Sequence, residues 1–356
     1  MPNVQKLSLS ELYIRKILVL LKQAQRTSPV VIMIDNFGRE ITYLRLSVTD
    51  LCNLRCKYCM PEQGVCKKAH EDMMTLEEML KGVKTALSLG IRKFRLTGGE
   101  PLLKRNIIDI CRKISELEGV ENLCITTNGV LLEKYAKDLK EAGVKGVNIS
   151  LDTLDREKFV YMTGKDELES VKRGIKAALK EGFEKVKINT VLIGGFNDDE
   201  AESLSKLTLK YPLDLRFIEL MPMNREANFG KESFVPLDYL AASLKGLQNL
   251  DDEMLSEEDK GSVAKLYKYE GGLGRVGFIS AVSNHFCASC NRIRLTADGK
   301  IKPCLHSERE INIKGLDELS MKEAFKEAIL NKPIAHGDLS FGNFTKSARS
   351  MNCIGG

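Results

Sequence analysis

The chain contains 356 residues, with 54 Lys and Arg against 49 Asp and Glu, so its formal net charge is +5. Hydrophobic residues make up 43% and charged residues 29%, a composition that excludes a disordered chain and a membrane protein. The weak, dispersed charge does not indicate a nucleic-acid partner, although it suits an anionic small molecule. The apolar run at residues 17–21 is far shorter than the roughly 20 residues of a membrane span. We therefore expect a globular cytoplasmic protein that acts without nucleic acid or membrane.

Six short β-rich runs alternate with helical patterns from residue 43 onward. Helical spacing is clear at residues 75–89, where Thr75 and Glu78 have the spacing of a capping box, and again at 157–180. This alternation predicts an α/β fold whose parallel sheet is open or closed into a barrel. The six runs span residues 43–48, 93–97, 123–127, 146–151, 186–193 and 214–219.

Polar residues recur at every second position in four of these runs, although a parallel strand covered on both faces is normally apolar throughout. If helices cover the outer face of the sheet, the polar face must line the barrel interior. The interior is then expected to hold a charged ligand, whereas most barrel interiors are filled with aliphatic side chains. An antiparallel sheet with a solvated face is the alternative, which the helical connections disfavour. The polar pairs are Arg45 and Ser47, Arg95 and Thr97, Asn148 and Ser150, and Lys187 and Asn189.

The pattern changes after residue 219. Hairpin-like strands are expected near 263–269 and 276–282, and we expect three regions: an N-terminal extension (1–32), a barrel (33–233) and a smaller C-terminal domain (234–356). Gly272, Gly274 and Gly277 form a GxGxxG string, but a dinucleotide-binding loop needs a strand before it and a helix after it. The string is therefore expected to be a hairpin turn.

Ten cysteines are more than packing requires, and in a reducing compartment they favour metal binding over disulfides. One set is a CxxxCxxC loop, and a second is CxxC followed by a further cysteine fourteen residues on. The remaining cysteines, expected to be incidental thiols, are Cys66, Cys111, Cys124 and Cys353. The two sets are Cys52, Cys56 and Cys59, and Cys287, Cys290 and Cys304.

Three thiolates on one loop can bind three irons of an iron-sulfur cube and leave the fourth iron open. A structural zinc site, the alternative, normally closes with four ligands. The CxxxCxxC loop directly follows the first predicted strand and so lies at the carboxyl end of the sheet, where α/β barrels place their active sites.

The first loop resembles the CxxxCΦxC motif of the radical S-adenosylmethionine (SAM) superfamily, in which Φ is aromatic and here is Tyr58. After the second strand, residues 97–101 (TGGEP) resemble the superfamily element that contacts the methionine amino group of SAM. Two adjacent glycines also let the backbone approach a ligand closely. The resemblance implies a partial (β/α)6 barrel of the radical SAM type with a smaller C-terminal Fe-S domain.

Within this superfamily, several segments resemble the family of GTP 3′,8-cyclases, which begin molybdenum cofactor biosynthesis. The likeness runs from about residue 33 to residue 356; Leu51 departs from it, since Arg is common there in the family. Family members tend to begin near Met33, so we expect Met33 to be the natural start. The matching segments are 46–50 (LSVTD), 59–61 (CMP), 126–129 (TTNG), 216–219 (RFIE), 291–294 (NRIR) and 354–356 (IGG).

The resemblance also assigns residues to ligands. It implies two [4Fe-4S] clusters, one on each cysteine set, and gives the terminal Gly355 and Gly356 a role in the radical step. The SAM contacts implied are Tyr58, Gly99, Ser150 and Met221. The GTP contacts implied are Arg45, Arg95, Thr126, Lys187, Arg292, Ile293 and Arg294. Guanidinium groups suit a triphosphate because they are permanently charged and bidentate.

The implied activity is a lyase reaction. SAM, cleaved at the first cluster, yields a 5′-deoxyadenosyl radical that takes the 3′ hydrogen of GTP, and cyclisation gives (8S)-3′,8-cyclo-7,8-dihydroguanosine 5′-triphosphate. The implied partners are an external electron donor and a functional link to cyclic pyranopterin monophosphate synthase, and a homodimer is compatible with the resemblance. Two alternatives stay open: another radical SAM enzyme with an auxiliary cluster, such as a peptide-modifying maturase, and a non-catalytic zinc- or RNA-binding module.

Overall fold

The computed structural model describes residues 32–60, 69–223, 229–256, 259, 262–337, 339–340 and 343–355. The N-terminal extension expected at residues 1–32 lies outside these ranges except for Ile32, as do Cys66 and Gly356.

All six predicted strands are present, each within one residue of its expected limits. Short runs rich in β-branched and large apolar residues form them, as strand propensity predicts. The strands are β1 (Tyr43–Ser47), β2 (Lys93–Thr97), β3 (Asn122–Thr127), β4 (Gly146–Ser150), β5 (Lys185–Leu192) and β6 (Asp214–Glu219).

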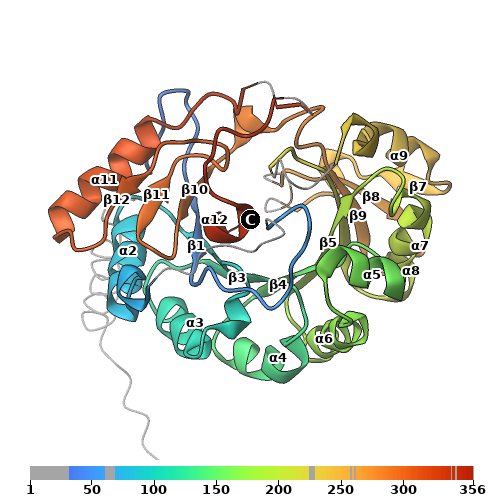
Figure 1. Cartoon of the computed structure of the whole chain (residues 1–356), viewed down its shortest axis with the longest axis horizontal. Helices are drawn as coiled ribbons and strands as arrows, with labels where there is room; N and C mark the ends of the chain where they lie inside the picture. Colours follow the sequence, from blue (N-terminus) through green and yellow to red (C-terminus); the bar gives the residue numbers. More distant parts are fainter. Residues whose placement is uncertain are drawn as a thin grey trace, which may run out of the picture.

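Helices cover the outside of this sheet (Figure 1). The Thr75–Glu78 capping box is present at the start of α2, which confirms that prediction. The pattern expected to form one helix at 157–180 instead forms two, because Gly164 adopts a left-handed φ of 73° and ends α5. No described helix is long and apolar enough to cross a membrane. The helices around the barrel are α2 (Leu76–Ser88), α3 (Ile107–Ser115), α4 (Leu132–Glu141), α5 (Arg156–Thr163), α6 (Leu168–Lys180), α7 (Ala201–Ser205) and α8 (Leu207–Lys210).

The later part of the chain adds strands to both edges of the same sheet, in the order β12-β11-β10-β1-β2-β3-β4-β5-β6-β9-β8-β7. Strand β10 pairs in parallel with β1, and β9 pairs in parallel with β6. These additions are β7 (Leu247–Asn249), β8 (Lys265–Tyr269), β9 (Arg275–Ile279), β10 (Arg292–Leu295), β11 (Lys300–Lys302) and β12 (Ile311–Asn312), with helices α9 (Leu237–Ser243), α11 (Glu318–Leu330) and α12 (Met351–Ile354).

The predicted partial barrel is therefore confirmed, and the expected β8–β9 hairpin is antiparallel. The GxGxxG string forms the turn of this hairpin and the start of β9, which excludes a dinucleotide loop there. The boundary at 233/234 stays a prediction. Short α12 lies inside the ring of strands, so the last described residues reach the barrel interior (Figure 1).

The two faces of the sheet differ in chemistry. Leu44, Leu46, Phe94 and Leu96 are almost fully buried between the strands and the outer helices. Arg45 and Arg95 pair side by side in the register of β1 and β2 and line the interior cavity. Because alternate residues of a strand face opposite sides, one polar set per strand is enough to make the interior polar, as the sequence predicts.

Candidate active site

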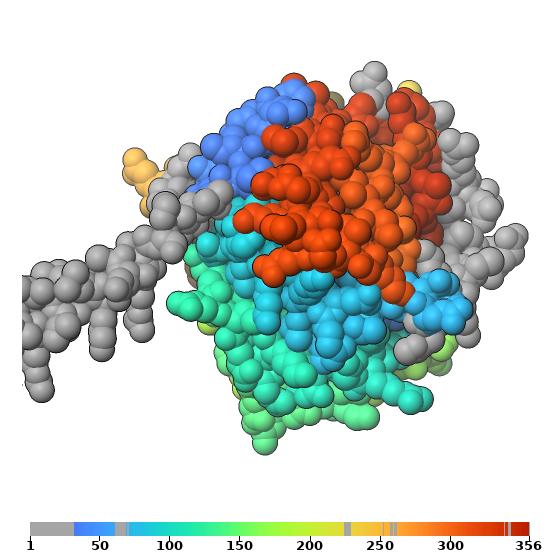
Figure 2. Space-filling view, turned by 90° about the vertical axis from the view of Figure 1, so that its left-hand side faces the viewer, coloured from blue at the N-terminus to red at the C-terminus, as the bar shows by residue number. Residues whose placement is uncertain are grey.

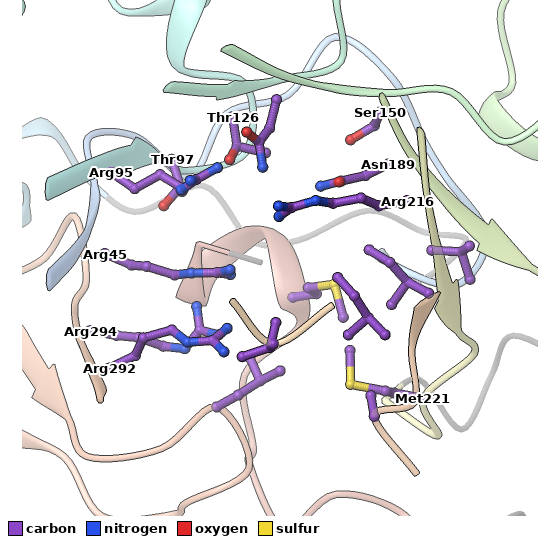
Figure 3. A pocket seen from close by; sticks show the side chains of 18 of the residues that line it. Arg45, Arg95, Thr97, Thr126, Ser150, Asn189, Arg216, Met221, Arg292 and Arg294 are labelled. Carbon is purple, nitrogen blue, oxygen red and sulfur yellow. The ribbon is translucent and has the colours of Figure 1, made fainter. Parts of the chain in front are cut away.

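The barrel interior holds a cavity with a volume of about 420 Å³, in the range typical of ligand sites. Residues from all six barrel strands line it, and so do both cysteine sets. Figure 3 shows the basic side chains of the cavity pointing inward from opposite sides. The sequence motifs, which are far apart along the chain, thus meet in one space.

The first cysteine loop follows β1 and is held by the end of α5. The backbone N–H of Arg55 donates to the carbonyl of Thr163 (2.8 Å), and that of Lys57 donates to Met162 (3.1 Å). Burial raises the pKa of the Cys56 thiol well above its usual value and that of Cys59 to about 12, and neighbouring cysteines add to both shifts. Crowded thiols of this kind favour a positively charged occupant that stabilises their thiolates.

The glycine pair of the TGGEP segment packs against this loop. A Cβ on Gly98 would lie 2.3 Å from the Thr49 carbonyl oxygen, and a Cβ on Gly99 would lie 2.2 Å from that of Leu51. The backbone N–H of Gly99 donates to Thr49 O at 2.8 Å. These glycines therefore allow the loops that follow β1 and β2 to touch. The sequence alone predicts only that they let the backbone approach a ligand closely.

Glu100, in the same TGGEP segment, is fully buried and forms hydrogen bonds with the carboxyl end of β3. Its carboxylate accepts hydrogen bonds from Thr127 Oγ1 (2.8 Å) and from the backbone N–H groups of Asn128 (2.7 Å) and Leu102 (2.9 Å). Burial outweighs these bonds and raises the pKa of Glu100 to about 7. The carboxylate thus joins the loops after β2 and β3 at the cavity wall.

The four residues assigned to SAM all line the cavity: Tyr58, Gly99, Ser150 and Met221. The Tyr58 hydroxyl is already used, because it donates to Asp152 Oδ2 at 2.8 Å. Asp152 Oδ1 also accepts from the backbone N–H of Val191 (2.9 Å), and burial raises the pKa of this carboxyl to about 6. The phenol of Tyr58 is therefore fixed in place, and its ring and backbone remain to contact a ligand.

A group of basic side chains occupies the same cavity. Guanidinium ends from the β1 side and from β6 point toward one another (Figure 3). Within the part of the chain that is described, Arg45 Nε, Arg216 Nε and Asn189 Oδ1 are buried without a hydrogen-bond partner. Buried polar atoms are normally paired, so these atoms indicate a polar ligand that completes them.

Electrostatic repulsion marks the group as an anion site. Burial, together with repulsion from nearby Arg216 and Arg95, lowers the pKa of Lys187 to about 7. Burial, with repulsion from Arg294, also holds the pKa of Arg45 well below its usual value. Several like charges held together in a buried space destabilise the empty protein, and a multiply charged anion removes that cost.

The second cysteine set comes from the segment before β10, which carries Cys287 and Cys290, and from the segment after β11, which carries Cys304. Burial acts to raise the pKa of the Cys290 thiol, but Lys332, Arg292 and N–H donors outweigh it and lower the pKa to about 7. His285 and His336 bring ring nitrogens close to Cys287, since the three ligand atoms lie within 4.8 Å of one another. A zinc ion is therefore a competing occupant here.

The predicted substrate contacts divide in two. Six line the cavity: Arg45, Arg95, Thr126, Lys187, Arg292 and Arg294. Ile293 faces the other way, and its side chain is fully buried in the core, because it alternates with its neighbours along β10. Its side chain therefore cannot contact a ligand in the cavity, so only the backbone of Ile293 can make the predicted GTP contact.

Sequence reasoning also missed contributors. Arg216 and Asp152 had no assigned role, and Asn189 was placed only on the polar face. Asp214 and Arg216 alternate in β6 like the polar pairs in the other strands, so a signal for Arg216 was present. Asp152 follows β4 by two residues, at the carboxyl end where barrels carry their sites.

Each cysteine set fits a cluster held by three thiolates. Both sets line one cavity, and the described residues 50–60 of the first loop carry three cysteines and no histidine. The carboxyl-end loops, with Gly98 and Gly99 packed tightly, leave room beside the first set for a ligand. A cofactor bound there would lie within the same cavity as the basic group.

Family models match these features. The model of the Radical SAM superfamily matches residues 46–208, and that of Molybdenum Cofactor Synthesis C matches residues 213–337. The crystal structure of Streptococcus suis SuiB has a similar fold, with a TM-score of 0.59 at 14% identity over 90% of this chain and 78% of that chain. The barrel with its first cysteine loop is thus of the radical SAM class, whose members use a [4Fe-4S] cluster and SAM.

Curated relatives narrow this class. The chain is 46% identical to the GTP 3′,8-cyclase of Alkaliphilus oremlandii over 329 residues, which is 91% of this chain and 100% of the relative. It is 43% identical to the GTP 3′,8-cyclase of Moorella thermoacetica over 329 residues, with the same coverage. At this identity and coverage, the chain belongs to the GTP 3′,8-cyclase family.

Proposed function

We propose that this protein converts GTP to (8S)-3′,8-cyclo-7,8-dihydroguanosine 5′-triphosphate, the first step of molybdenum cofactor biosynthesis. One observation carries the proposal: two three-cysteine sets and a group of partly unpaired basic side chains share a single cavity. Such a cavity can hold a redox-active cofactor and a polyanionic substrate together.

Cys52, Cys56 and Cys59 would hold the first [4Fe-4S] cluster, and Cys287, Cys290 and Cys304 the second. When bound, the first cluster and SAM supply the radical chemistry that side chains cannot. The side chains and backbone of the protein would bind and orient SAM and GTP. Gly99, Ser150, Met221 and the fixed ring of Tyr58 would hold SAM beside the first set.

The basic group would hold the triphosphate. Arg45, Arg95, Arg294 and Lys187 present charged donors to phosphate oxygens, and Thr126 adds a hydroxyl donor. Arg216 lies in the same group and would join them. The second set and Arg292 line the same cavity, and an open iron of a cluster there would take the guanine. Fixing both reactants in one enclosed space replaces a bimolecular encounter with a positioned one.

The end of the chain would complete the site. Gly355 is buried, and its carbonyl accepts a hydrogen bond from Arg294. The tail, proposed to assist the radical step, therefore contacts a residue proposed to bind substrate.

Further proposals concern partners and location. We infer that an external donor supplies the electron, that cyclic pyranopterin monophosphate synthase takes up the product, and that the protein acts in the cytoplasm, with a homodimer as its assembly. Pull-down with the synthase and sedimentation velocity test the link and the assembly separately.

The experiment is an anaerobic assay of the iron-loaded chain with SAM, dithionite and GTP, followed by mass spectrometry. We expect 5′-deoxyadenosine and the cyclised nucleotide, with about eight irons per chain for two clusters. Cys52→Ala should abolish both products, whereas Cys287→Ala should abolish only the nucleotide. Formation of 5′-deoxyadenosine without consumption of GTP would support the radical SAM chemistry but contradict the assignment of GTP as substrate. Zinc in place of iron would reject both.

A further inference from the structure

Lys332, which follows α11, is a buried lysine beside the second cysteine set. Its side chain is almost fully enclosed, with 2% of its surface exposed. Its Nζ donates to the carbonyl of Arg292 (2.8 Å) and to that of Pro303 (3.0 Å). Arg292 follows Cys290 by two residues and Pro303 immediately precedes Cys304, so one ammonium group joins the two ligand loops.

No carboxylate of the described residues forms an ion pair with Lys332. A buried charge without a counter-ion is costly, so an anion nearby must offset it. The Cys290 sulfur lies at such a position, because the Lys332 side chain forms a hydrogen bond with it. The charge of Lys332 is therefore directed at the cysteine site and not at another side chain.

The segment that begins with Lys332 surrounds the same site. The backbone N–H of His336 donates to the Cys287 thiol, and the His336 ring nitrogen Nε2 lies 3.1 Å from the carbonyl of Ala281. Residues 332–336 thus contact two of the three cysteines.

Arg39 holds this segment from the other side. Its guanidinium donates to the carbonyls of Pro333 (2.8 Å), Ile334 (3.2 Å) and Cys287 (2.8 Å), while Nε pairs with Asp35 at 2.6 Å. The segment near residue 39 and the region around α11 lie side by side on the surface, as Figure 2 shows in blue and red-orange. The position of Lys332 is therefore fixed by contacts to backbone and does not depend on a ligand.

The consequence for a cluster is electrostatic. Three thiolates give an oxidised [4Fe-4S] cluster a net negative charge, and reduction adds another. Net charge and hydrogen bonds to the sulfurs set the reduction potential of such clusters. A fixed ammonium in a site of low dielectric stabilises the reduced form more than the oxidised form.

We propose that Lys332 is a positioning residue that holds the two ligand loops of the second cluster together and raises the reduction potential of that cluster. The inference rests on the proposed function, since it requires a [4Fe-4S] cluster on Cys287, Cys290 and Cys304. It assigns a role to a residue that no sequence motif singled out.

The test uses the full chain with Cys52, Cys56 and Cys59 replaced by Ala, so that the EPR signal belongs to the second cluster. In this background we compare Lys332→Met, Lys332→Gln and Lys332→Arg. Lys302→Met is the control, because Lys302 is equally buried near the same loops but pairs with Glu310 at 3.1 Å. The readouts are iron content and the midpoint potential from an EPR-monitored redox titration.

We expect Lys332→Met and Lys332→Gln to lower the reduced fraction at a fixed potential at least tenfold, which is about 59 mV for a one-electron couple. Lys332→Arg and Lys302→Met should stay close to the parent. If the neutral variants fail to bind iron while Lys332→Arg binds it, the charge is needed for the cluster itself, which also supports the proposal.

Three outcomes would overturn the inference: an unchanged potential in an iron-loaded neutral variant, an equal shift in Lys302→Met, or loss of the cluster in Lys332→Arg as well. A parent chain without a [4Fe-4S] signal would instead reject the second cluster and with it the proposed function. The two failures are therefore distinguishable.

Discussion

The guanidinium of Arg294 donates a hydrogen bond to the backbone carbonyl of Gly355 inside the barrel, although 61 residues separate the two. Gly355 has a φ of 76°, and a Cβ on it would lie 2.1 Å from Thr97 Oγ1. The end of the chain is thus locked between strand β2 and a basic side chain of the cavity, and only glycine fits there.

Replacing Gly355 with Ala should therefore displace the tail. The left-handed backbone costs a non-glycine residue about 1 kcal/mol or more, and the clash with Thr97 adds to it. We expect cyclised nucleotide formation to fall at least tenfold while 5′-deoxyadenosine is still formed, as measured by the ratio of the two products.

Gly337→Ala is the matched control, because Gly337 has a φ of 79° and nothing within 4 Å of its Cβ position. It should carry the same backbone strain without the loss of product. An active Gly355→Ala variant would show that the tail has no part in the reaction.

The barrel could be predicted because its signals are local. Alternation of apolar and polar residues in β1, β2, β4 and β5 revealed both the strands and the polar interior. The break between α5 and α6 was missed because a single glycine, Gly164, interrupts a pattern that otherwise continues.

Contacts between segments that are far apart in the chain could not be predicted, because no local sequence pattern indicates them. Strand β9 was expected as part of a hairpin, but its parallel pairing with β6 depends on the whole sheet. Lys332 reaches carbonyls 29 and 40 residues earlier in the chain, so nothing near it in the sequence indicates its position.

Arg216→Met should weaken GTP binding without destabilising the empty protein. Hydrogen bonds to charged groups contribute about 1.5–3 kcal/mol, so we expect GTP affinity to fall roughly 10- to 150-fold in calorimetry. Because Arg216 Nε has no partner within the described structure, removing this charge should not lower the melting temperature. Arg173→Met, at an exposed salt bridge with Glu133, should leave the affinity unchanged. A normal affinity in Arg216→Met would remove Arg216 from the substrate site.

GTP binding should take up a proton at Lys187. The pKa of this lysine in the empty cavity is about 7, so above pH 7 it is mostly neutral, and phosphate binding favours the charged form. GTP affinity should therefore fall as the pH rises above 7, by up to about tenfold per unit. Calorimetry in buffers of different ionisation enthalpy measures the uptake directly. Lys187→Met should bind GTP more weakly and lose this uptake; if the uptake persists in the variant, another group is responsible.

Tyr58→Phe should destabilise the protein more at pH 8 than at pH 5. Asp152, with a pKa raised to about 6, is charged at pH 8 and would then lose a donor, at a cost of about 1–3 kcal/mol. At pH 5 the carboxyl is protonated and needs the donor less. Thermal melts of the apo-protein at both pH values give the comparison. Tyr161→Phe, at an exposed tyrosine, should leave the melting temperature unchanged at both pH values. An equal loss of stability at pH 5 and pH 8 for Tyr58→Phe would contradict the ionisation assigned to Asp152.

In the proposed reaction, one cavity brings SAM at the first cysteine set to the ribose of GTP at the basic group. The most direct measurement uses GTP carrying deuterium at C3′, in an anaerobic single-turnover reaction of the iron-loaded chain, with mass spectrometry of 5′-deoxyadenosine. We predict one deuterium in 5′-deoxyadenosine for each cyclised nucleotide formed. Unlabelled 5′-deoxyadenosine accompanied by the cyclised product would contradict the account, because the hydrogen would then have come from another position.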